Sequence, residues 1–395
     1  MKKTIQRFFD ALRPRFEKGG QFQRWYAFYE SIETIFFAPG EPTTATPHVR
    51  DSLDVKRYMA SVVVVLLPLL VFGMYNTGYQ SQLASGKTPE LLSAVWIGFA
   101  AVMPLVIVSY LFGFGWEIVF ARIRGHEISE GVFVTAMLFP LTLPPTTPLW
   151  QAALGISFGV VIGKEIFGGT GRNFLNPALT GRAFLYFAYP VQMSGDAVWT
   201  VLSGARQTAV DAFSSATPLV VAFEAKTAGA VEEALAEAGY PFWKLFFGLY
   251  PDSIGASSTF LCLVGALVLM AIGVASYRII VGDILGVVLT GAVLNLIAAE
   301  GSIPYMTMNP FYHLIIGGTA FGIAFMTTDP VSAPDLHPAR WIYGFLIGVL
   351  TVLIRVFNPA FPEGIMLAIL FMNVFAPLLD HVVLRFRLRR RIANV

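Results

Sequence analysis

Long runs of apolar residues recur along the chain between residues 58 and 384, separated by short polar segments. A helix of roughly 20 residues crosses a bilayer core of about 30 Å, so runs of this kind predict membrane-spanning helices. The pattern predicts an all-α integral membrane protein with about ten transmembrane helices. The expected spans are 58–75, 91–110, 112–121 extended into 131–146, 149–167, 178–193, 259–276, 279–299, 311–327, 340–357 and 363–384.

The second and third of these segments are difficult to separate by hydropathy alone. We favour one helix across 95–120, followed by a shorter helix across 130–146 that prolines interrupt. Helix breaks at membrane depth are tolerated only where neighbouring protein or a cavity satisfies the freed backbone groups. Such breaks in polytopic proteins often line a binding site.

An internal repeat relates the two halves of the chain. The first half reads PLWQAALGISFG from Pro148 and then NPA at 176–178, and the second reads ARWIYGFLIG from Ala339 and then NPA at 358–360. Each is preceded by a proline-broken apolar segment, at 137–145 and at 326–334. The pattern predicts two inverted five-helix repeats, 58–193 and 258–384, whose broken helices meet near the membrane midplane. Chance likeness between two glycine-rich apolar stretches is the alternative.

The positive charges are distributed unevenly about these spans. If residues 1–57 form a cytoplasmic or interfacial arm and the ten helices alternate, 22 of the 27 Lys and Arg residues fall on the cytoplasmic side. The positive-inside rule therefore places both termini in the cytoplasm, the basic tail 385–395 included. This arrangement predicts a multi-pass protein of a bacterial inner membrane. The acidic segment 194–257 becomes a large outer, periplasmic loop, with a short helix expected at 227–238.

Composition agrees with this assignment and excludes several other classes of protein. Charged residues make up 13% of the chain and mean hydropathy is +0.65, whereas a soluble domain carries about 25% charged residues. A net charge of +2 gives no electrostatic case for nucleic-acid binding. The lone Cys262 excludes a disulfide framework within the chain, and the five histidines predict neither haem nor a protein-held metal cluster. The basic N-terminus lacks the apolar core of a cleaved signal peptide.

A glycine-rich stretch, GGTGRNFLNP at 168–177, follows the fourth predicted helix. Gly168 and Gly169 would let the backbone approach a planar ligand, Arg172 supplies charge, and Asn173 and Asn176 supply donors and acceptors. The spacing matches neither a phosphate-binding loop nor a dinucleotide fingerprint. A tight helix–helix turn without a ligand explains the residues equally well.

The outer loop contains SSATP at 214–218, in which Thr217 precedes a proline and is kept out of the helical region. An exposed, extended threonine of this kind is accessible to a modifying enzyme, although most such segments are only turns.

Several carboxylates lie within or beside the predicted spans. Ionisable groups there are costly and mark ion paths or paired sites, so Glu117, Asp329 and Asp380 are candidates for a Na⁺ path. Na⁺ is a hard cation and prefers oxygen ligands. Glu165 has Lys164 beside it, and Asp283 is close to Arg278, so simple pairing explains those two acids equally well.

Four segments together resemble one family. They are GGTGRNFLNPAL at 168–179, SSATP at 214–218, TDPVSA at 328–333 and NPAFPEG at 358–364. The chain resembles, over essentially its whole length, the B subunits of Na⁺-translocating NADH:quinone oxidoreductases. The related D subunit of the ferredoxin-linked electron-transport complex shares the helix plan but lacks the long N-terminal arm, so the arm favours the quinone-reducing complex.

This resemblance implies FMN bound through its phosphate to Thr217, in a motif completed by Ser214 and Ser215, where Ser215 replaces the glycine common in the family. It also implies a non-covalent riboflavin, which we expect at Gly168, Gly169, Arg172, Asn173 and Asn176. Ubiquinone reduction is implied near the cytoplasmic face, and the candidate residues for it are Trp25, Phe28, Gly113 and Gly115.

The implied activity is that of a translocase subunit, an NADH:ubiquinone reductase (Na⁺-transporting), in which electrons pass from FMN through riboflavin to ubiquinone as Na⁺ is exported. The implied partners are an NADH-oxidising subunit, a second FMN-carrying subunit and a flavin transferase. Two alternatives remain: a small-solute channel of similar fold, which gives no reason to modify Thr217, and a structural anchor without cofactors.

Overall fold

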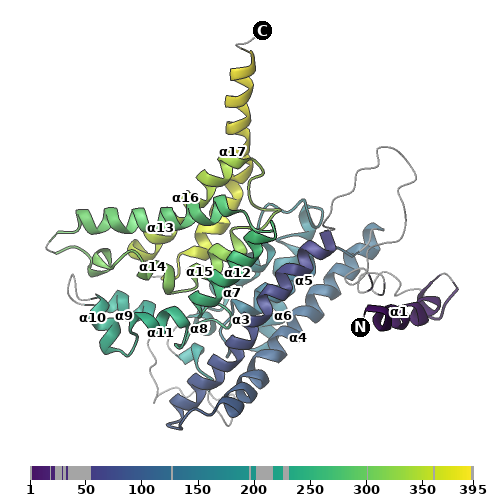
Figure 1. Cartoon of the computed structure of the whole chain (residues 1–395), viewed down its shortest axis with the longest axis horizontal. Coiled ribbons are helices and arrows are strands. Elements are labelled where there is room, and N and C mark those ends of the chain that lie inside the picture. Colours follow the sequence, from purple (N-terminus) through teal and green to yellow (C-terminus); the bar gives the residue numbers. More distant parts are fainter. Residues whose placement is uncertain are drawn as a thin grey trace.

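The computed structural model confirms an all-α membrane protein (Figure 1). It describes residues 2–17, 19–22, 29, 33, 55–125, 128–194, 197–201, 217–225, 231–299, 301–358 and 361–392, and every regular element in these ranges is helical. The α-helices are α1 (Lys2–Phe16), α3 (Val55–Ala84), α4 (Leu91–Arg124), α5 (Gly131–Leu141), α6 (Leu149–Val161), α7 (Pro177–Ala188), α8 (Pro190–Met193), α9 (Pro218–Glu224), α10 (Val231–Glu237), α11 (Phe242–Phe247), α12 (Thr259–Ala271), α13 (Tyr277–Ile297), α14 (Tyr312–Ile315), α15 (Thr319–Phe321), α16 (His337–Phe357) and α17 (Ile365–Ile392). Short 3-10 helices cover Glu165–Phe167, Ala197–Trp199 and Pro304–Thr307, and a π-helix covers Gly322–Met326.

Six helical segments of the described chain are long and apolar enough to cross a membrane. They are Lys56–Ala84, Leu91–Arg124, Leu149–Phe167, Tyr277–Ile297, His337–Phe357 and Ile365–Arg389, and α5 and α12 are shorter apolar helices. Side chains such as Leu92, Trp96 and Leu296 are more than two-thirds exposed, as expected of helices that face lipid. Every predicted span coincides with one of these helices, with α7, or with the interrupted segment from α14 to the π-helix.

The favoured division of the second and third segments is confirmed. One continuous helix, α4, runs to Arg124 and ends at Gly125, whose φ of 70° is left-handed, a conformation that glycine adopts without penalty. The shorter helix α5 begins at Gly131 and contains Pro140.

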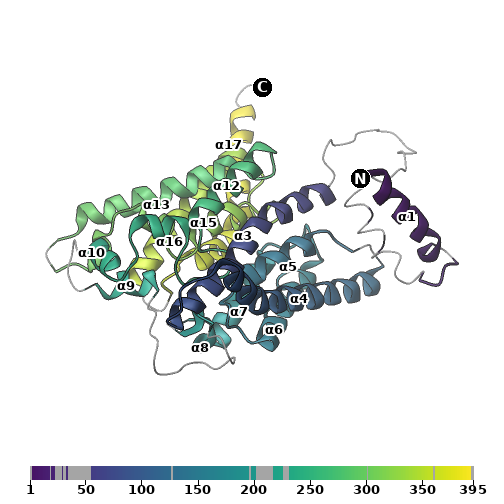
Figure 2. The same ribbon diagram turned by 60° about the horizontal axis from the view of Figure 1, so that its bottom comes forward.

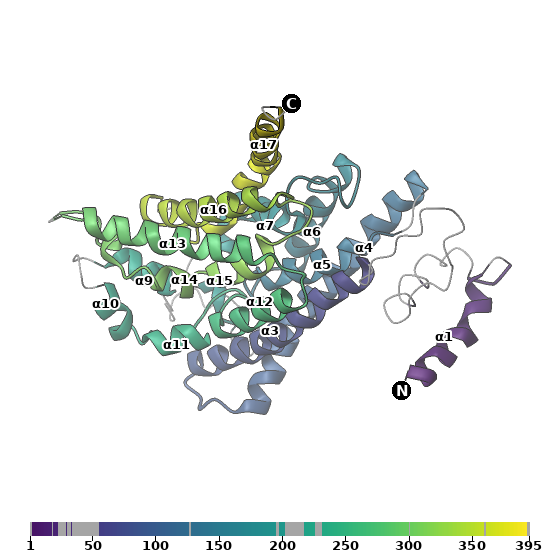
Figure 3. The same cartoon turned by 45° about the horizontal axis from the view of Figure 1, so that its top comes forward.

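Neighbouring spans approach closely where small residues meet a facing backbone. A Cβ atom at Gly98 of α4 would lie 1.7 Å from the carbonyl oxygen of Met74 in α3, and one at Gly348 of α16 would lie 2.2 Å from the carbonyl oxygen of Asp283 in α13. These contacts allow α3 to lie along α4 and α13 to lie along α16 (Figures 1 and 3). Such close backbone packing stabilises helix association in lipid, where apolar burial gives little driving force.

The two proline-broken segments leave the regular helical pattern inside the protein. Beyond α5, the carbonyl oxygens of Leu141 and Leu143 accept hydrogen bonds from the amides of Gly255 and Ile254, at 2.7 and 3.2 Å. In the second half, α14 and α15 are single turns that continue into the π-helix. Protein groups therefore satisfy the freed backbone, as irregular structure at membrane depth requires.

The packing of the helices is alike in only part of the two halves, because α3 lies along α4 whereas α12 packs on α3 and not along α13. In the first half α4 packs on α6 and α6 on α7, and in the second α13 packs on α16 and α16 on α17. The two NPA segments nevertheless differ locally, because Asn176 caps the start of α7 whereas Asn358 ends α16. The inverted orientation of the repeats and their boundaries stay predictions.

The segments outside the repeats include two short helices. The N-terminal helix α1 lies apart from the bundle in all three views (Figures 1 to 3). In the outer loop, α10 lies within the helix expected at 227–238.

Three basic residues used to assign sidedness are buried in the protein. Lys164 and Arg182, counted as cytoplasmic, form ion pairs inside the bundle, and Arg355, counted as outer, is fully buried. These residues carry no information about sidedness, but most of the charge asymmetry does not depend on them.

Candidate functional site: an inner cleft and an outer pocket

A cleft with about 690 Å³ of empty space opens between the two halves of the chain. The first half contributes α3, α5 and the loop before α7, and the second half contributes the end of α12, the π-helix and the turn 328–331. Its polar lining includes Thr135, Lys164, Asn173, Asn176 and Asp329. Because Arg122 and Arg124 end the adjoining α4, the predicted topology places this inner cleft toward the cytoplasm.

Asn173 and Asn176 present complementary groups to the cleft. The side-chain nitrogen of Asn173 donates to the carbonyl of Leu175 at 3.0 Å, which leaves its oxygen as an acceptor. The side-chain oxygen of Asn176 accepts from the amides of Ala178 and Leu179 and caps α7, which leaves its nitrogen as a donor. A planar ring whose edge alternates donors and acceptors, as an isoalloxazine does, fits this pair of amides.

The glycines of the same stretch serve the turn and lie outside the cleft lining. Gly168 and Gly169 have φ values of 116° and 93°, which only glycine adopts readily. Arg172 is exposed and also lies outside the lining. These three residues do not line this cleft, and their contact with a ligand stays a prediction, whereas Thr170, between them, does line it.

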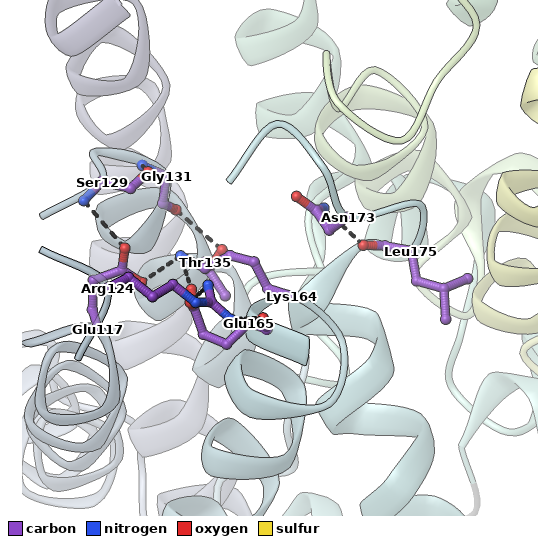
Figure 4. Close-up of polar contacts among 9 residues, drawn as sticks. All are labelled: Glu117, Arg124, Ser129, Gly131, Thr135, Lys164, Glu165, Asn173 and Leu175. Atoms are coloured by element: carbon purple, nitrogen blue, oxygen red, sulfur yellow. Dashed lines mark hydrogen bonds and ion pairs between the residues drawn. The ribbon is translucent and has the colours of Figure 1, made fainter. Parts of the chain in front are cut away.

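A buried cluster of charges adjoins the cleft (Figure 4). The Lys164 ammonium lies 2.5 Å from Oε2 of Glu117 and 3.4 Å from Oε1 of Glu165. Arg124 pairs with Oε2 of Glu165 at 2.8 Å and donates a further hydrogen bond to the Glu165 carbonyl. The amide of Ser129 donates to Oε1 of Glu117 at 3.1 Å. The side chains of Lys164, Glu117 and Glu165 are at most 3% exposed, so these charges depend on one another for stability.

A second pocket, with about 480 Å³ of empty space including its open mouth, contains Thr217. The predicted topology places it on the outer side, and we call it the outer pocket. Thr217 has an extended backbone, with φ −66° and ψ 155°, and its hydroxyl oxygen accepts from the amide of Val220 at 3.4 Å as the cap of α9. Tyr186 and Trp199 also line the pocket and provide aromatic surface, while Asp252 and Glu363 provide carboxylates.

Asp252 lies in the loop between α11 and α12, outside the membrane-spanning segments. Burial raises the pKa of its carboxyl group to about 6, and the negative charge of Glu363 adds to this rise. The amide of Ser253 donates to Oδ1 at 2.7 Å, whereas Oδ2 has no hydrogen bond within the described chain. The outer pocket therefore gains negative charge as pH rises through 6.

Two arginines position the wall of the outer pocket. Arg355 is fully buried and donates to the carbonyls of His313, Ile316, Pro362 and Glu363 and to the hydroxyl of Thr319.

Arg182 of α7 pairs with the Glu363 carboxylate at 2.5 Å, which connects the first half of the chain to the second. A smaller space beside this pair, lined by Arg182, Glu363, Gly322 and Met326, lies between the outer pocket and the π-helix.

The three acids proposed for an ion path occupy different settings. Glu117 is paired with Lys164, and Asp329 lines the inner cleft while accepting from the Val331 amide and the Ser332 hydroxyl. Asp380 accepts from the amides of Asp335 and Leu336 and so holds the start of α16. The structure does not bring the three together, and their role in ion transport stays a prediction.

The candidate quinone residues are not gathered in the inner cleft. Gly113 packs inside the bundle against Val132, Ala136 and Ile156, whereas Gly115 faces open space on α4. Trp25 and Phe28, like Ser214 and Ser215 of the flavin motif, lie outside the described residues.

Sequence reasoning missed the positions of Lys164, Asp252 and Arg355. A signal existed for Lys164 and Arg355, because each is a cation within or at the end of an apolar run, where an unpaired charge is costly. Of the two alternatives left open for Asp283, pairing with Arg278 is excluded, since neither carboxyl oxygen of Asp283 has a hydrogen-bond partner in the described chain.

Comparisons with known proteins agree over the whole length of the chain. Residues 42–388 match the model of the NQR2, RnfD, RnfE family. The chain is 49% identical to the B subunit of the Na(+)-translocating NADH-quinone reductase of Ectopseudomonas mendocina (strain ymp), with 99% of each chain covered. It is 48% identical, with the same coverage, to the corresponding B subunits of Stutzerimonas stutzeri (strain A1501) and Azotobacter vinelandii (strain DJ / ATCC BAA-1303). The chain therefore belongs to the NQR2, RnfD, RnfE family.

Proposed function

We propose that this chain is the membrane flavoprotein subunit of a Na⁺-exporting NADH:ubiquinone reductase. The three relatives carry a Na⁺-translocating NADH-quinone reductase in their names and match the chain from end to end. Their full-length match, N-terminal arm included, favours this assignment over a D-type subunit of the ferredoxin-linked complex. In this proposal the chain lies in the bacterial inner membrane, with both termini cytoplasmic.

The observation that carries the redox role is the inner cleft with its two amides. Asn173 offers an acceptor and Asn176 a donor, while Tyr58 and Phe325 line the same space with aromatic rings. This set fits a riboflavin held without a covalent bond, because the ring needs apolar surface on its faces and polar partners at its edge. When bound, the flavin supplies one-electron chemistry that the side chains alone lack.

The outer pocket is the proposed location of FMN, bound through its phosphate to the Thr217 hydroxyl. The hydroxyl lies at the start of α9 and lines a pocket with aromatic walls. A flavin transferase is the partner that forms the phosphoester. Electrons from an NADH-oxidising subunit and a second FMN-carrying subunit then pass by way of the two flavin sites of this chain to ubiquinone, while Na⁺ moves outward.

In-gel fluorescence of the denatured subunit, expressed with a flavin transferase, tests this proposal. The wild type and Thr217→Ser keep a hydroxyl and are expected to fluoresce, and Thr217→Ala is expected to be dark. Thr146→Ala is the matched control, since Thr146 is another hydroxyl near the outer loop, bonded to the carbonyl of Val198. A second flavin released by denaturation is expected from all four proteins. A dark wild type that also releases no flavin would favour a channel or an anchor.

A further inference from the structure

The charge cluster beside the inner cleft is formally neutral when all its members are ionised. Glu117 and Glu165 contribute two negative charges, and Lys164 and Arg124 contribute two positive ones. Arg124 is occupied by Glu165 and is 29% exposed, whereas Lys164 is shared between both carboxylates and is 3% exposed. Such a network is stable only while its charges balance, because an uncompensated charge in a low-dielectric interior is strongly destabilising.

Lys164 belongs to two environments at once. Its ammonium lies between Glu117 and Glu165 (Figure 4). Its side chain also lines the cleft, together with Asn173 and Asp329. An electron added to a group in the cleft therefore attracts the ammonium of Lys164 away from the carboxylates. No other lysine or arginine lines this cleft within the described residues.

The carboxylates offer oxygen atoms to a replacement cation. Oε1 of Glu165 accepts no hydrogen bond within the described chain, although the side chain of Glu165 is fully buried. Its nearest cation is Lys164, at 3.4 Å, which is long for a charge-assisted hydrogen bond. Oε2 of Glu117 has Lys164 as its ion-pair partner. When Lys164 turns toward the cleft, these two oxygens need a new positive charge, and a hard monovalent cation prefers such ligands.

We propose that Lys164 couples reduction in the cleft to Na⁺ uptake at Glu117 and Glu165. This inference rests on the proposed flavin in the inner cleft. One electron, delivered by a one-electron donor of the NADH-oxidising complex, reduces the flavin, and the Lys164 ammonium compensates the added charge. One Na⁺ ion enters between the carboxylates, so that charge balances without breaking a covalent bond or moving a proton. Passage of the electron to the quinone returns Lys164 to Glu117 and expels the ion.

Redox titration of the non-covalent flavin in the purified complex tests this coupling at low and high Na⁺, with ionic strength held constant by K⁺. In the wild type, a tenfold rise in Na⁺ is expected to raise the ratio of reduced to oxidised flavin up to tenfold at a fixed potential, which is about 59 mV for a one-electron couple. Lys56→Gln is the matched control. It removes a cation from another carboxylate pair, Lys56 with Glu130 at 3.6 Å, and should titrate as the wild type.

The two single variants are expected to shift the potential in opposite directions. Lys164→Gln leaves the cluster negative and lowers the reduced-to-oxidised ratio at least tenfold at low Na⁺. Glu117→Gln leaves Lys164 without one of its carboxylates and raises the ratio at least tenfold. Both variants lose the Na⁺ dependence, because the first binds a cation in either redox state and the second needs none. If either fails to assemble, the neutral double variant Lys164→Gln/Glu117→Gln replaces it, and it should be independent of Na⁺.

Binding of ²²Na⁺ to oxidised and chemically reduced complex gives a second measurement. The wild type is expected to bind one more Na⁺ after reduction, and Lys164→Gln is expected to bind that ion before reduction. Wild-type Na⁺ dependence in both single variants, or shifts of the same sign, would overturn the coupling while leaving the flavin site intact. A wild-type complex without a non-covalent flavin would overturn the coupling and the proposed function together.

Discussion

The inner cleft and the outer pocket differ in how they could hold the isoalloxazine ring of a flavin. The inner cleft presents neutral amides, the Lys164 cation and the Asp329 carboxylate, whereas the outer pocket presents two carboxylates, of which that of Glu363 is paired with Arg182. A ring without phosphate suits the inner cleft and needs no covalent bond. A phosphate beside the Asp252 carboxylate is repelled, so a phosphorylated flavin would stay in the outer pocket only if it were covalently bound, and Thr217 provides the hydroxyl for that bond.

The comparison also shows how each region depends on the rest of the fold. The polar groups of the inner cleft come from both halves of the chain. The outer pocket depends on Arg355 and Arg182, which connect α16 and α7 to the segment that contains Glu363. Substitutions at these supporting residues should therefore damage one region while sparing the other.

The largest effect is expected from Arg355→Met. The variant leaves four carbonyls and the Thr319 hydroxyl without their donor, and each buried acceptor left unsatisfied costs about 1–3 kcal/mol. The outer pocket should lose its wall, so the content of covalently bound flavin should decrease more than the content of the inner flavin. Arg355→Lys should recover only part of the stability, because it has three donors rather than five. Melting temperature and the ratio of the two flavins measure this effect, and equal loss of both flavins would contradict it.

Arg182→Gln should have the next largest effect. It leaves the Glu363 carboxylate without its partner at a partly buried position, which costs about 2 kcal/mol. The double variant Arg182→Gln/Glu363→Gln removes both charges and should recover most of that loss. Denaturation in detergent measures these free energies, and additive losses in the double variant would show that the pair contributes no coupling.

A smaller effect on stability is expected from Asn176→Ala, which removes the cap of α7 and costs about 1 kcal/mol. The variant should also lose the inner flavin while covalent flavin at Thr217 remains. Asn176→Ser separates the two roles, because serine caps the helix but lacks the amide nitrogen. Flavin content after denaturation measures the contact with the ligand, and melting temperature measures the capping of α7. Full flavin binding in Asn176→Ser would exclude the amide as a ligand.

The smallest effect is expected from Asp252→Asn and depends on pH. The folded chain holds the Asp252 proton up to about pH 6, whereas the ordinary pKa of the group is 3.8. The stability contributed by the protonated group is therefore fully present below about pH 4 and is lost as pH rises through 6. Asp252→Asn should flatten this part of the profile and raise the melting temperature at pH 7 by about 2 °C. An unchanged slope between pH 4 and 7 would contradict the raised pKa.

Much of the fold followed from local sequence, because the apolar runs and their breakers act on the residues that contain them. The run 95–120 determined a single helix, and Gly125 and the prolines after residue 139 determined where helices end. Asn173 and Asn176 could be singled out because both amides lie in one short glycine-rich stretch, which is a local signal for hydrogen bonding to a ligand or to the turn itself. Local sequence could not separate the two roles of Gly168 and Gly169, since a tight turn and a ligand loop require the same glycines.

The sequence by itself determined that this chain spans a membrane with helices, because hydropathy and helix length are properties of each segment. Only the tertiary structure decided which polar groups meet. Lys164 is 47 residues from Glu117, and Arg182 is 181 residues from Glu363. Those pairings depend on how α4 packs on α6 and on where the two halves of the chain meet. A local sequence pattern cannot predict such long-range ion pairs. Function at both sites depends on these long-range charges, because burial makes each of them require a partner.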